Sequence, residues 1–207
     1  MTRYYSQFGE DAILAYLFKD QTEGVYLDIG AHNGVTDSNT MLLSLKGWSG
    51  ICVEPHSVYY QALVKNRPHS ICFNYVAWDV DGETVDFHET APGGWSRVGG
   101  GGKHATVRVT HPETITLDSL LEDYEGFFDV VSIDVEGHED HVMGGWKNWR
   151  NYDPRVLIVE DISYGGKLDE VFKEYYKVYA WKQGKQGSNI WYCREEKDYE
   201  YVKRAYR

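Results

Sequence analysis

The stretch Val25-Tyr26-Leu27-Asp28-Ile29-Gly30-Ala31-His32-Asn33-Gly34 decides the fold. Its first five residues are mostly apolar and predict a buried β-strand, which ends in a turn that contains two glycines. Glycines at such a turn let the backbone bend tightly and come close to a ligand. The turn resembles the dinucleotide-binding fingerprint, but Asp28 takes the place of the first glycine. The stretch therefore predicts a nucleotide-type ligand with an acid beside it.

Helical and strand-like patterns alternate along the rest of the chain. Apolar spacing predicts helices over residues 10–19, 37–46, 58–63, 117–121, 138–149 and 168–172. Apolar runs predict strands over residues 25–29, 51–54, 71–77, 128–134 and 156–160, with a terminal hairpin of 178–181 and 189–193. Residues 81–110 predict a β insertion with a glycine-rich loop before the fourth strand. Such alternation is typical of an α/β fold, in which helices cover both faces of a mostly parallel sheet.

Length and composition narrow the class of protein. The 207 residues suit a single domain over 1–207, which is either a whole protein or one domain of a larger one. The formal net charge of −11 argues against nucleic acid as the main partner. No apolar run is long enough to span a membrane, and the N-terminus lacks the apolar segment of a signal peptide. We therefore expect a cytoplasmic protein with no membrane partner; the oligomeric state is left open.

Acidic residues stand at the ends of four predicted strands: Asp28, Glu54, Asp134 and the pair Glu160-Asp161. The carboxyl ends of parallel strands meet at one edge of the sheet, where ligands of such folds bind. A carboxylate at Asp28 would repel a pyrophosphate, which prefers backbone N–H groups. S-adenosylmethionine (SAM) has no phosphate and carries an ammonium and a sulfonium that an acid favours. The sequence therefore predicts SAM rather than a dinucleotide as the ligand.

Two further features fit the nucleoside part of that ligand. Glu54 follows Gly34 by twenty residues and ends the next strand, where an acid accepts hydrogen bonds from ribose hydroxyls. Ala77 and Trp78 follow the third strand, where adenine usually lies, and Trp78 is either a stacking partner or a core residue. In the alternative interpretation Asp28 caps a helix and Glu54 is a solvated strand end.

Several blocks of sequence, taken in order, resemble the FkbM-type methyltransferases. The blocks are Ser6-Gln7-Phe8-Gly9-Glu10-Asp11, Asp28 to Gly34, Ser38-Asn39-Thr40, Gly47-Trp48-Ser49-Gly50, Glu54-Pro55 and Ser132-Ile133-Asp134-Val135-Glu136-Gly137-His138-Glu139. The resemblance implies a Rossmann-like class I fold, a seven-stranded sheet with its last strand antiparallel. It also implies SAM-dependent O-methylation, often of sugar or polyketide hydroxyls.

The same resemblance implies a set of cofactor-binding residues. By motif, Asp28, Gly30, Asn39 and Glu54 would hold SAM, and Gln7 would lie near its methionine end. Ala31 and Gly34 belong to the same turn.

The segment from Asp134 to Glu139 offers two routes for activating a hydroxyl. In the first route His138 or Asp134 is the general base, with Glu136 close by. In the second, Asp134 binds Mg²⁺ together with Glu160 or Asp161 and so lowers the pKa of the hydroxyl. The alternative to both is that Glu136 and Glu139 favour a helix N-terminus while His138 is merely exposed.

The glycine-rich insertion supplies candidates for binding the acceptor. Trp95, Ser96 and Arg97 could contact a saccharide ring, and the segment is either a mobile lid or a disordered connection. We expect SAM-dependent O-methylation of a small-molecule or saccharide hydroxyl, most often of a sugar or glycan. The rival hypotheses are a nicotinamide-dependent oxidoreductase and a non-catalytic SAM-binding module.

Overall fold

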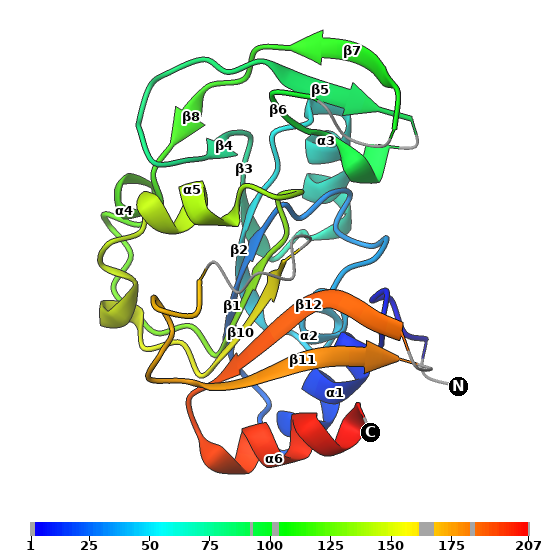
Figure 1. The fold of residues 1–207 in the computed structure, drawn as a ribbon, viewed down its shortest axis with the longest axis vertical. Helices are drawn as coiled ribbons and strands as arrows, with labels where there is room; N and C mark the ends of the chain where they lie inside the picture. The colour runs from blue at the N-terminus through cyan, green and yellow to red at the C-terminus, as the bar shows by residue number, and fades with distance from the viewer. Residues whose placement is uncertain (1–2, 92, 101–103, 162–167, 183–184, 207) are drawn as a thin grey trace.

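A seven-stranded sheet forms the centre of the molecule (Figure 1). The computed structural model describes residues 3–91, 93–100, 104–161, 168–182 and 185–206. The strand order is β11-β12-β10-β9-β1-β2-β3. The strands are β1 Val25–Ile29, β2 Ser49–Val53, β3 Ser70–Phe73, β9 Val130–Ile133, β10 Val156–Glu160, β11 Tyr176–Lys182 and β12 Lys185–Cys193. The first five in chain order pair in parallel, whereas β12 is antiparallel to both of its neighbours. The predicted sheet and its antiparallel last strand are confirmed.

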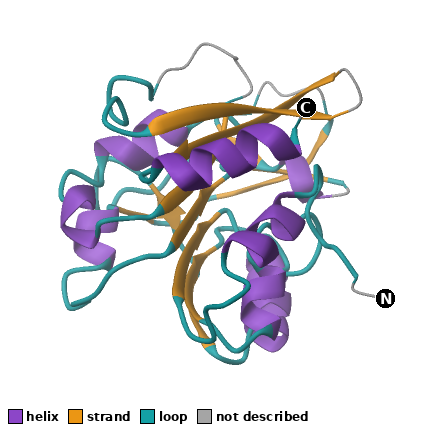
Figure 2. Cartoon of the chain, turned by 90° about the horizontal axis from the view of Figure 1, so that it is seen from below, coloured by secondary structure: helices purple, strands orange, loops and turns teal. Residues whose placement is uncertain are grey.

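Helices cover both faces of this sheet (Figure 2). They are α1 Glu10–Leu17, α2 Met41–Leu45, α3 Ser57–Asn66, α4 Leu117–Leu120, α5 Glu139–Gly144 and α6 Glu196–Ala205. Tyr26 packs in the core on the side of α1, α2 and α6, and the next residue, Leu27, packs in the core under α4 and α5. Successive side chains of a strand point to opposite faces, so β1 is buried on both sides. This double burial explains the continuous apolar run that predicted the strand.

The insertion between β3 and β9 forms two small sheets above the carboxyl ends of the main strands (Figure 1). One pairs β4 Val76–Ala77 with β8 Thr114–Ile115, and the other has the order β6-β5-β7. Its strands are β5 Phe87–Thr90, β6 Arg97–Val98 and β7 Thr106–Thr110, and a short helix, η1, spans Gly93–Trp95. The predicted β insertion is confirmed. The predicted strand 71–77 is two strands, because Val76 and Ala77 leave the main sheet to pair with β8.

Three predicted helices differ from the structure, and one helix of the structure was not predicted. The first is the start of α2: Asp37 has a left-handed φ of 53°, so that helix begins only at Met41 rather than at 37. The helix predicted over 138–149 ends at Gly144, next to a second glycine, and a 3₁₀ helix, η2, follows at Trp149–Tyr152. Residues 168–174 form turns rather than a helix. The helix α6 was not predicted, because most of its residues are polar.

Candidate functional site

The turn after β1 lies directly against the end of β9. Gly30 has a φ of +82°, and a Cβ at this position would lie 1.8 Å from the backbone oxygen of Asp134. The N–H groups of Gly30 and Ala31 both donate to the carbonyl of Val53, at 2.9 and 3.0 Å. Only glycine fits at position 30, because both its conformation and its lack of a side chain are needed. The turn thereby joins the ends of β1, β2 and β9 at one place.

A cleft of about 920 Å³ opens at this edge of the sheet, beneath the insertion. Most of the residues predicted for the site line it. They are Gln7, Asp28, Gly30, Ala31, Asn39, Glu54, Ala77, Trp78, Trp95, Ser96, Arg97, Asp134, Glu136, His138 and Glu160. Two predicted residues do not line the cleft, Gly34 and Asp161. The fold thus places the predicted cofactor, acceptor and catalytic residues in a single chamber.

Asp28 is buried at the base of the cleft and belongs to a polar network. The hydroxyl of Thr40 donates to its Oδ2 at 2.5 Å. Burial raises the pKa of Asp28, while the nearby Arg67 guanidinium and the Thr40 hydroxyl oppose that rise. Arg67 is fully buried and donates to the carbonyl of Gly34 at 2.7 Å and to the Tyr26 hydroxyl at 2.9 Å. The prediction overlooked Arg67, since a single arginine at the end of a helix carries no sequence signal.

Glu54 is held by backbone donors on both of its carboxylate oxygens. The N–H of His32 donates to Oε2 at 2.8 Å, and the N–H of His56 donates to Oε1 at 2.7 Å. Burial raises the pKa of Glu54 to about 7. The side chain is only 6% exposed, so the alternative of a solvated strand end is wrong. The ring of Tyr59 lies 4.0 Å from that of His32, and both line the cleft beside Glu54.

The side chains of Asp134, Glu136 and Glu160 meet on one wall of the cleft. Their carboxylate oxygens lie within 4.8 Å of one another, which is close enough for one metal ion to contact all three. Burial, followed by repulsion from Glu160, raises the pKa of Asp134 well above its usual range. Burial and the charge of Asp134 raise the pKa of Glu136 to about 8. Three like charges this close are costly unless protons or a cation neutralise them.

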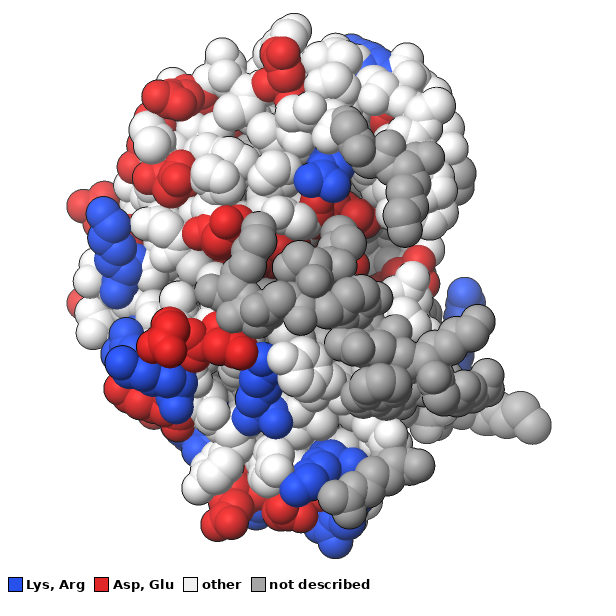
Figure 3. All heavy atoms as spheres, in the orientation of Figure 1, with Lys and Arg blue, Asp and Glu red and all other residues white. Residues whose placement is uncertain are grey.

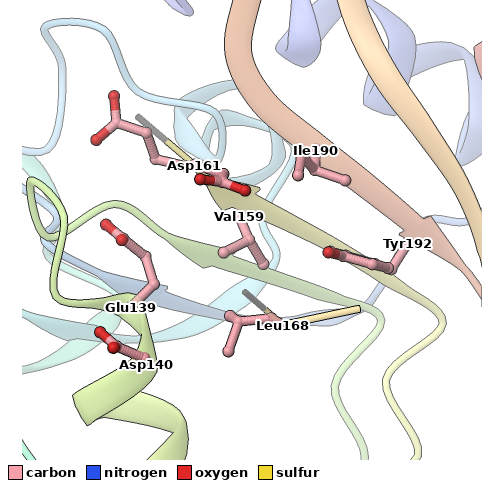
Figure 4. A pocket seen from close by; sticks show the side chains of 8 residues that line it. Glu139, Asp140, Val159, Asp161, Leu168, Ile190 and Tyr192 are labelled. Atoms are coloured by element: carbon pink, nitrogen blue, oxygen red, sulfur yellow. The ribbon is translucent and has the colours of Figure 1, made fainter. Parts of the chain in front are cut away.

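Asp161 does not join this acidic wall. It lies with Glu139 and Asp140 around a separate cavity of about 10 Å³ (Figure 4). Glu160 lines both this cavity and the cleft, whereas Asp161 lines the small cavity and not the cleft. The structure therefore replaces Asp161 by Glu136 in the set of candidate metal ligands.

His138 is half-buried and is tied to the insertion. Its Nε2 lies 3.1 Å from the backbone carbonyl oxygen of Val98. A carbonyl only accepts, so Nε2 carries the proton and Nδ1 is the nitrogen that can take one up. Burial lowers the pKa of His138, which keeps the imidazole neutral near pH 7. The alternative of a merely exposed histidine is wrong.

Trp78 lines the cleft beside His138. It is half-buried and stacks on His141, with ring centroids 3.9 Å apart and an interplanar angle of 6°. Its ring also lies 5.3 Å from that of His138. The cleft further contains Asn189 of β12, whose amide donates to the buried Glu10 at 2.7 Å. Asn189 was not predicted, because only the pairing of β12 with β10 brings it to the site.

The family model of the FkbM methyltransferase domain matches residues 28–184, which is more than half of the chain. The chain belongs to the FkbM methyltransferase family. The matched region contains the end of β1 and the whole of β2, β9 and β10, and the ends of these strands form the cleft. The family places the chain among methyltransferases rather than nicotinamide-dependent oxidoreductases.

Solved methyltransferases share the fold of this FkbM protein. A methyltransferase FkbM from Methylobacillus flagellatus has a TM-score of 0.54 at 11% identity, over 83% of this chain and 44% of that one. A putative O-methyltransferase from Klebsiella pneumoniae has a TM-score of 0.53 at 10% identity, over 93% and 83%. An O-methyltransferase from Bacillus cereus, solved in complex with SAH, has a TM-score of 0.51 at 12% identity, over 93% and 84%. This chain thus spans less than half the length of the Methylobacillus protein. No curated protein matches the chain.

Surface charge and helix length are the features relevant to nucleic-acid and membrane partners. On the face of the molecule seen in Figure 3, acidic side chains predominate in the upper half, and basic and acidic side chains are interspersed in the lower half. This face therefore has no continuous basic patch among its described residues. None of the helices that the structure describes combines the length and the apolar character needed to cross a bilayer.

Proposed function

We propose that this FkbM methyltransferase transfers the methyl group of SAM to a hydroxyl of a sugar or glycan. The observation that carries the proposal is the pair of buried carboxylates, Asp28 and Glu54, in the same cleft as His138. Asp28 is costly to ionise where it lies, and a ligand with positive charge would offset that cost. SAM offers such charge, and its ribose suits Glu54. The shared fold of an O-methyltransferase from Bacillus cereus solved with SAH supports this assignment.

The residues at the reacting end supply positioning and proton transfer. SAM provides a methyl group on a good leaving group, a positively charged sulfur, so the protein has mainly to align the acceptor and remove its proton. Nδ1 of His138 accepts the hydroxyl proton as the oxygen bonds to the methyl carbon and the carbon–sulfur bond breaks. The Val98 carbonyl then stabilises the imidazolium through its hydrogen bond to Nε2. Trp95 and Ser96 of the insertion face the same chamber and are proposed to contact the acceptor.

A second candidate for hydroxyl activation is a divalent metal such as Mg²⁺. The mutual proximity of Asp134, Glu136 and Glu160 favours it, because oxygen ligands suit Mg²⁺. The metal would lower the pKa of a bound hydroxyl, and His138 would then matter less. Turnover that is abolished by EDTA and restored by Mg²⁺ would support the metal. Turnover that survives EDTA and is lost in His138→Ala would support the base.

Calorimetric titration with SAM and SAH tests the cofactor assignment. We expect binding in the micromolar range for the wild-type protein and a loss of about ten-fold or more in Asp28→Asn and in Glu54→Gln. Asp20→Asn is the matched control, since that side chain is 89% exposed and lies outside the cleft. Folded wild-type protein that shows no heat with either ligand would contradict the proposal.

The partner class follows from the charge of the molecule. A net charge of −11 and the mixed surface of Figure 3 favour a small-molecule or saccharide acceptor over nucleic acid or a membrane. A cytoplasmic location stays a prediction from the sequence. Release of SAH in a screen of sugars and oligosaccharides, with oligonucleotides as the negative arm, would test the acceptor class.

A further inference from the structure

Arg97 brings a cation into an otherwise acidic chamber. It lies on β6, in the roof formed by the insertion, and faces the cleft beside His138. Among the described residues that line the cleft it is the only lysine or arginine. The acidic wall comes from a different part of the fold, the ends of β9 and β10. Arg97 therefore has a position from which it can contact whatever binds between the roof and the strand ends.

Within the described part of the chain, the guanidinium of Arg97 has few hydrogen-bond acceptors and no ion-pair partner. Its Nε is buried and has no hydrogen-bond partner. Its Nη2 lies 3.5 Å from Nε2 of His138, but both nitrogens are donors once Nε2 is bonded to Val98. No described carboxylate lies within ion-pair distance of it, although its charge does lower the pKa of Glu136. A half-buried guanidinium with unused donors is costly, and an anionic ligand group would repay that cost.

The backbone of Gly137 packs directly against the guanidinium of Arg97, and a side chain at position 137 would crowd it. Gly137 has a φ of +99°, and a Cβ there would lie only 3.3 Å from Nη2 of Arg97. Two residues before Arg97, the ring of Trp95 stacks on His104 at 3.8 Å and also faces the cleft. A flat aromatic surface and a guanidinium in the same cleft suit a sugar ring that carries an anion.

We propose that the acceptor is an anionic saccharide, and that Arg97 binds its carboxylate or phosphate next to the hydroxyl that is methylated. The proposal rests on the proposed function and narrows its substrate class. Arginine binds both kinds of anion in a bidentate manner, so a uronic acid and a sugar phosphate are the two sources to distinguish.

Matched pairs of saccharides test the proposal by titration in the presence of SAH. Glucuronate against glucose and galacturonate against galactose give the carboxylate arm, and glucose 6-phosphate against glucose gives the phosphate arm. We expect at least one anion to bind about ten-fold more tightly than its neutral partner. Arg97→Gln should abolish this difference, and Arg97→Lys should keep part of it. Arg108→Gln, which replaces an exposed arginine on β7 of the same small sheet, should leave it intact.

The outcomes separate this proposal from the proposed function. If SAM binds but no anion is preferred, or if Arg97→Gln keeps the preference, the assignment of Arg97 is wrong while the methyltransferase activity stands. If neither SAM nor SAH binds, the proposed function fails. In that case the saccharide titrations, repeated without SAH, still measure whether Arg97 gives a preference for anionic over neutral saccharides. Methyl transfer to the preferred anion, with a raised KM and little change in kcat in Arg97→Gln, would confirm a role in binding the acceptor.

Discussion

At the scale of single residues, the site depends on side chains that are held in costly states. Asp28 is a buried acid with a raised pKa, and Arg67 below it is a buried cation. The Thr40 hydroxyl links the two, because it donates to Asp28 and accepts from Arg67, and the Tyr26 hydroxyl accepts a further hydrogen bond from Arg67. Neither charge would persist in an apolar core without these partners. The network fixes Asp28 at the base of the cleft before any ligand arrives.

Replacing Gly30 by alanine should destabilise the protein and abolish cofactor binding. The added Cβ would clash with the Asp134 carbonyl, and the positive φ adds strain. Gly82 provides the matched control, because its φ is +73° and a Cβ there meets nothing within 4 Å. We expect Gly82→Ala to cost roughly 1–2 kcal/mol and Gly30→Ala clearly more. Urea denaturation measures both, and equal losses would contradict the role given to the contact.

The pH dependence of kcat/KM should identify the general base. Burial lowers the pKa of His138 from its usual 6.5, so base catalysis by His138 predicts that kcat/KM rises with pH along an acid limb whose midpoint lies below pH 6.5. The pKa of Glu136 is raised to about 8, so catalysis by Glu136 predicts a rise that extends to about pH 8. Profiles of the wild type and of Glu136→Gln, measured with saturating SAM, distinguish the two. An acid limb near pH 8 that disappears in Glu136→Gln would exclude His138 as the base.

At the scale of elements, strands of the insertion supply contacts to cleft residues that lie far away in the sequence. The strand β6 gives His138 its hydrogen-bond acceptor, and β5 gives the buried Glu89 that lies 3.6 Å from Nε2 of His56. The N–H of His56 in turn holds Glu54. The insertion thus contacts His138, the proposed base, and through His56 it contacts Glu54, the acid proposed to bind ribose.

The helix α6 is fastened to the sheet by an ion pair that should matter for stability only. Arg155 donates to both oxygens of Asp198, at 2.8 and 2.9 Å, and Asp198 is 2% exposed. We expect Asp198→Asn to cost about 3 kcal/mol, because it leaves a partly buried arginine unpaired. Glu195→Gln, which removes a carboxylate 3.9 Å from Arg155, should cost far less. Chemical denaturation measures the loss, and unchanged SAM affinity is expected in both variants.

At the scale of the whole molecule, several buried acids in and beside the cleft have raised pKa values, which favours their protonated forms. Burial raises the pKa of Glu54 to about 7 and that of Glu136 to about 8 in the cleft, and raises the pKa of Glu139, which lines the smaller cavity, to about 7. At these acids the folded state binds more protons than the unfolded state between about pH 4.5 and 8, so they make stability fall as pH rises through this window. The lowered pKa values of His32, His56 and His138 act in the opposite direction at the acidic end of the window. Ionised acids lower the stability of the free protein, and the same negative charge would favour the positively charged ligand proposed above.

The free protein should accordingly be more stable at pH 5 than at pH 8.5. Glu54 alone accounts for a loss of up to about 3 kcal/mol, and SAM should offset part of the total by favouring the charged acids. Urea denaturation at the two pH values, with and without SAM, measures the effect. Glu54→Gln should flatten the pH dependence. A stability that rises with pH would contradict the assignment.

The sequence by itself determined most of the strands of the sheet and the acids at its edge, and the resemblance implied that the last strand is antiparallel. It could do so because apolar periodicity and strand-end positions are local properties, and parallel strands bring their ends together regardless of detail. Only the tertiary structure decided which of those acids meet. Glu136 rather than Asp161 joins Asp134 and Glu160, because the turn after β9 brings the Glu136 carboxylate to the other two, whereas Asp161 lines the smaller cavity and not the cleft. It also decided that Val98 sets the tautomer of His138 and that Arg67 lies under Asp28. Such contacts join residues far apart in the chain, and no local pattern encodes them.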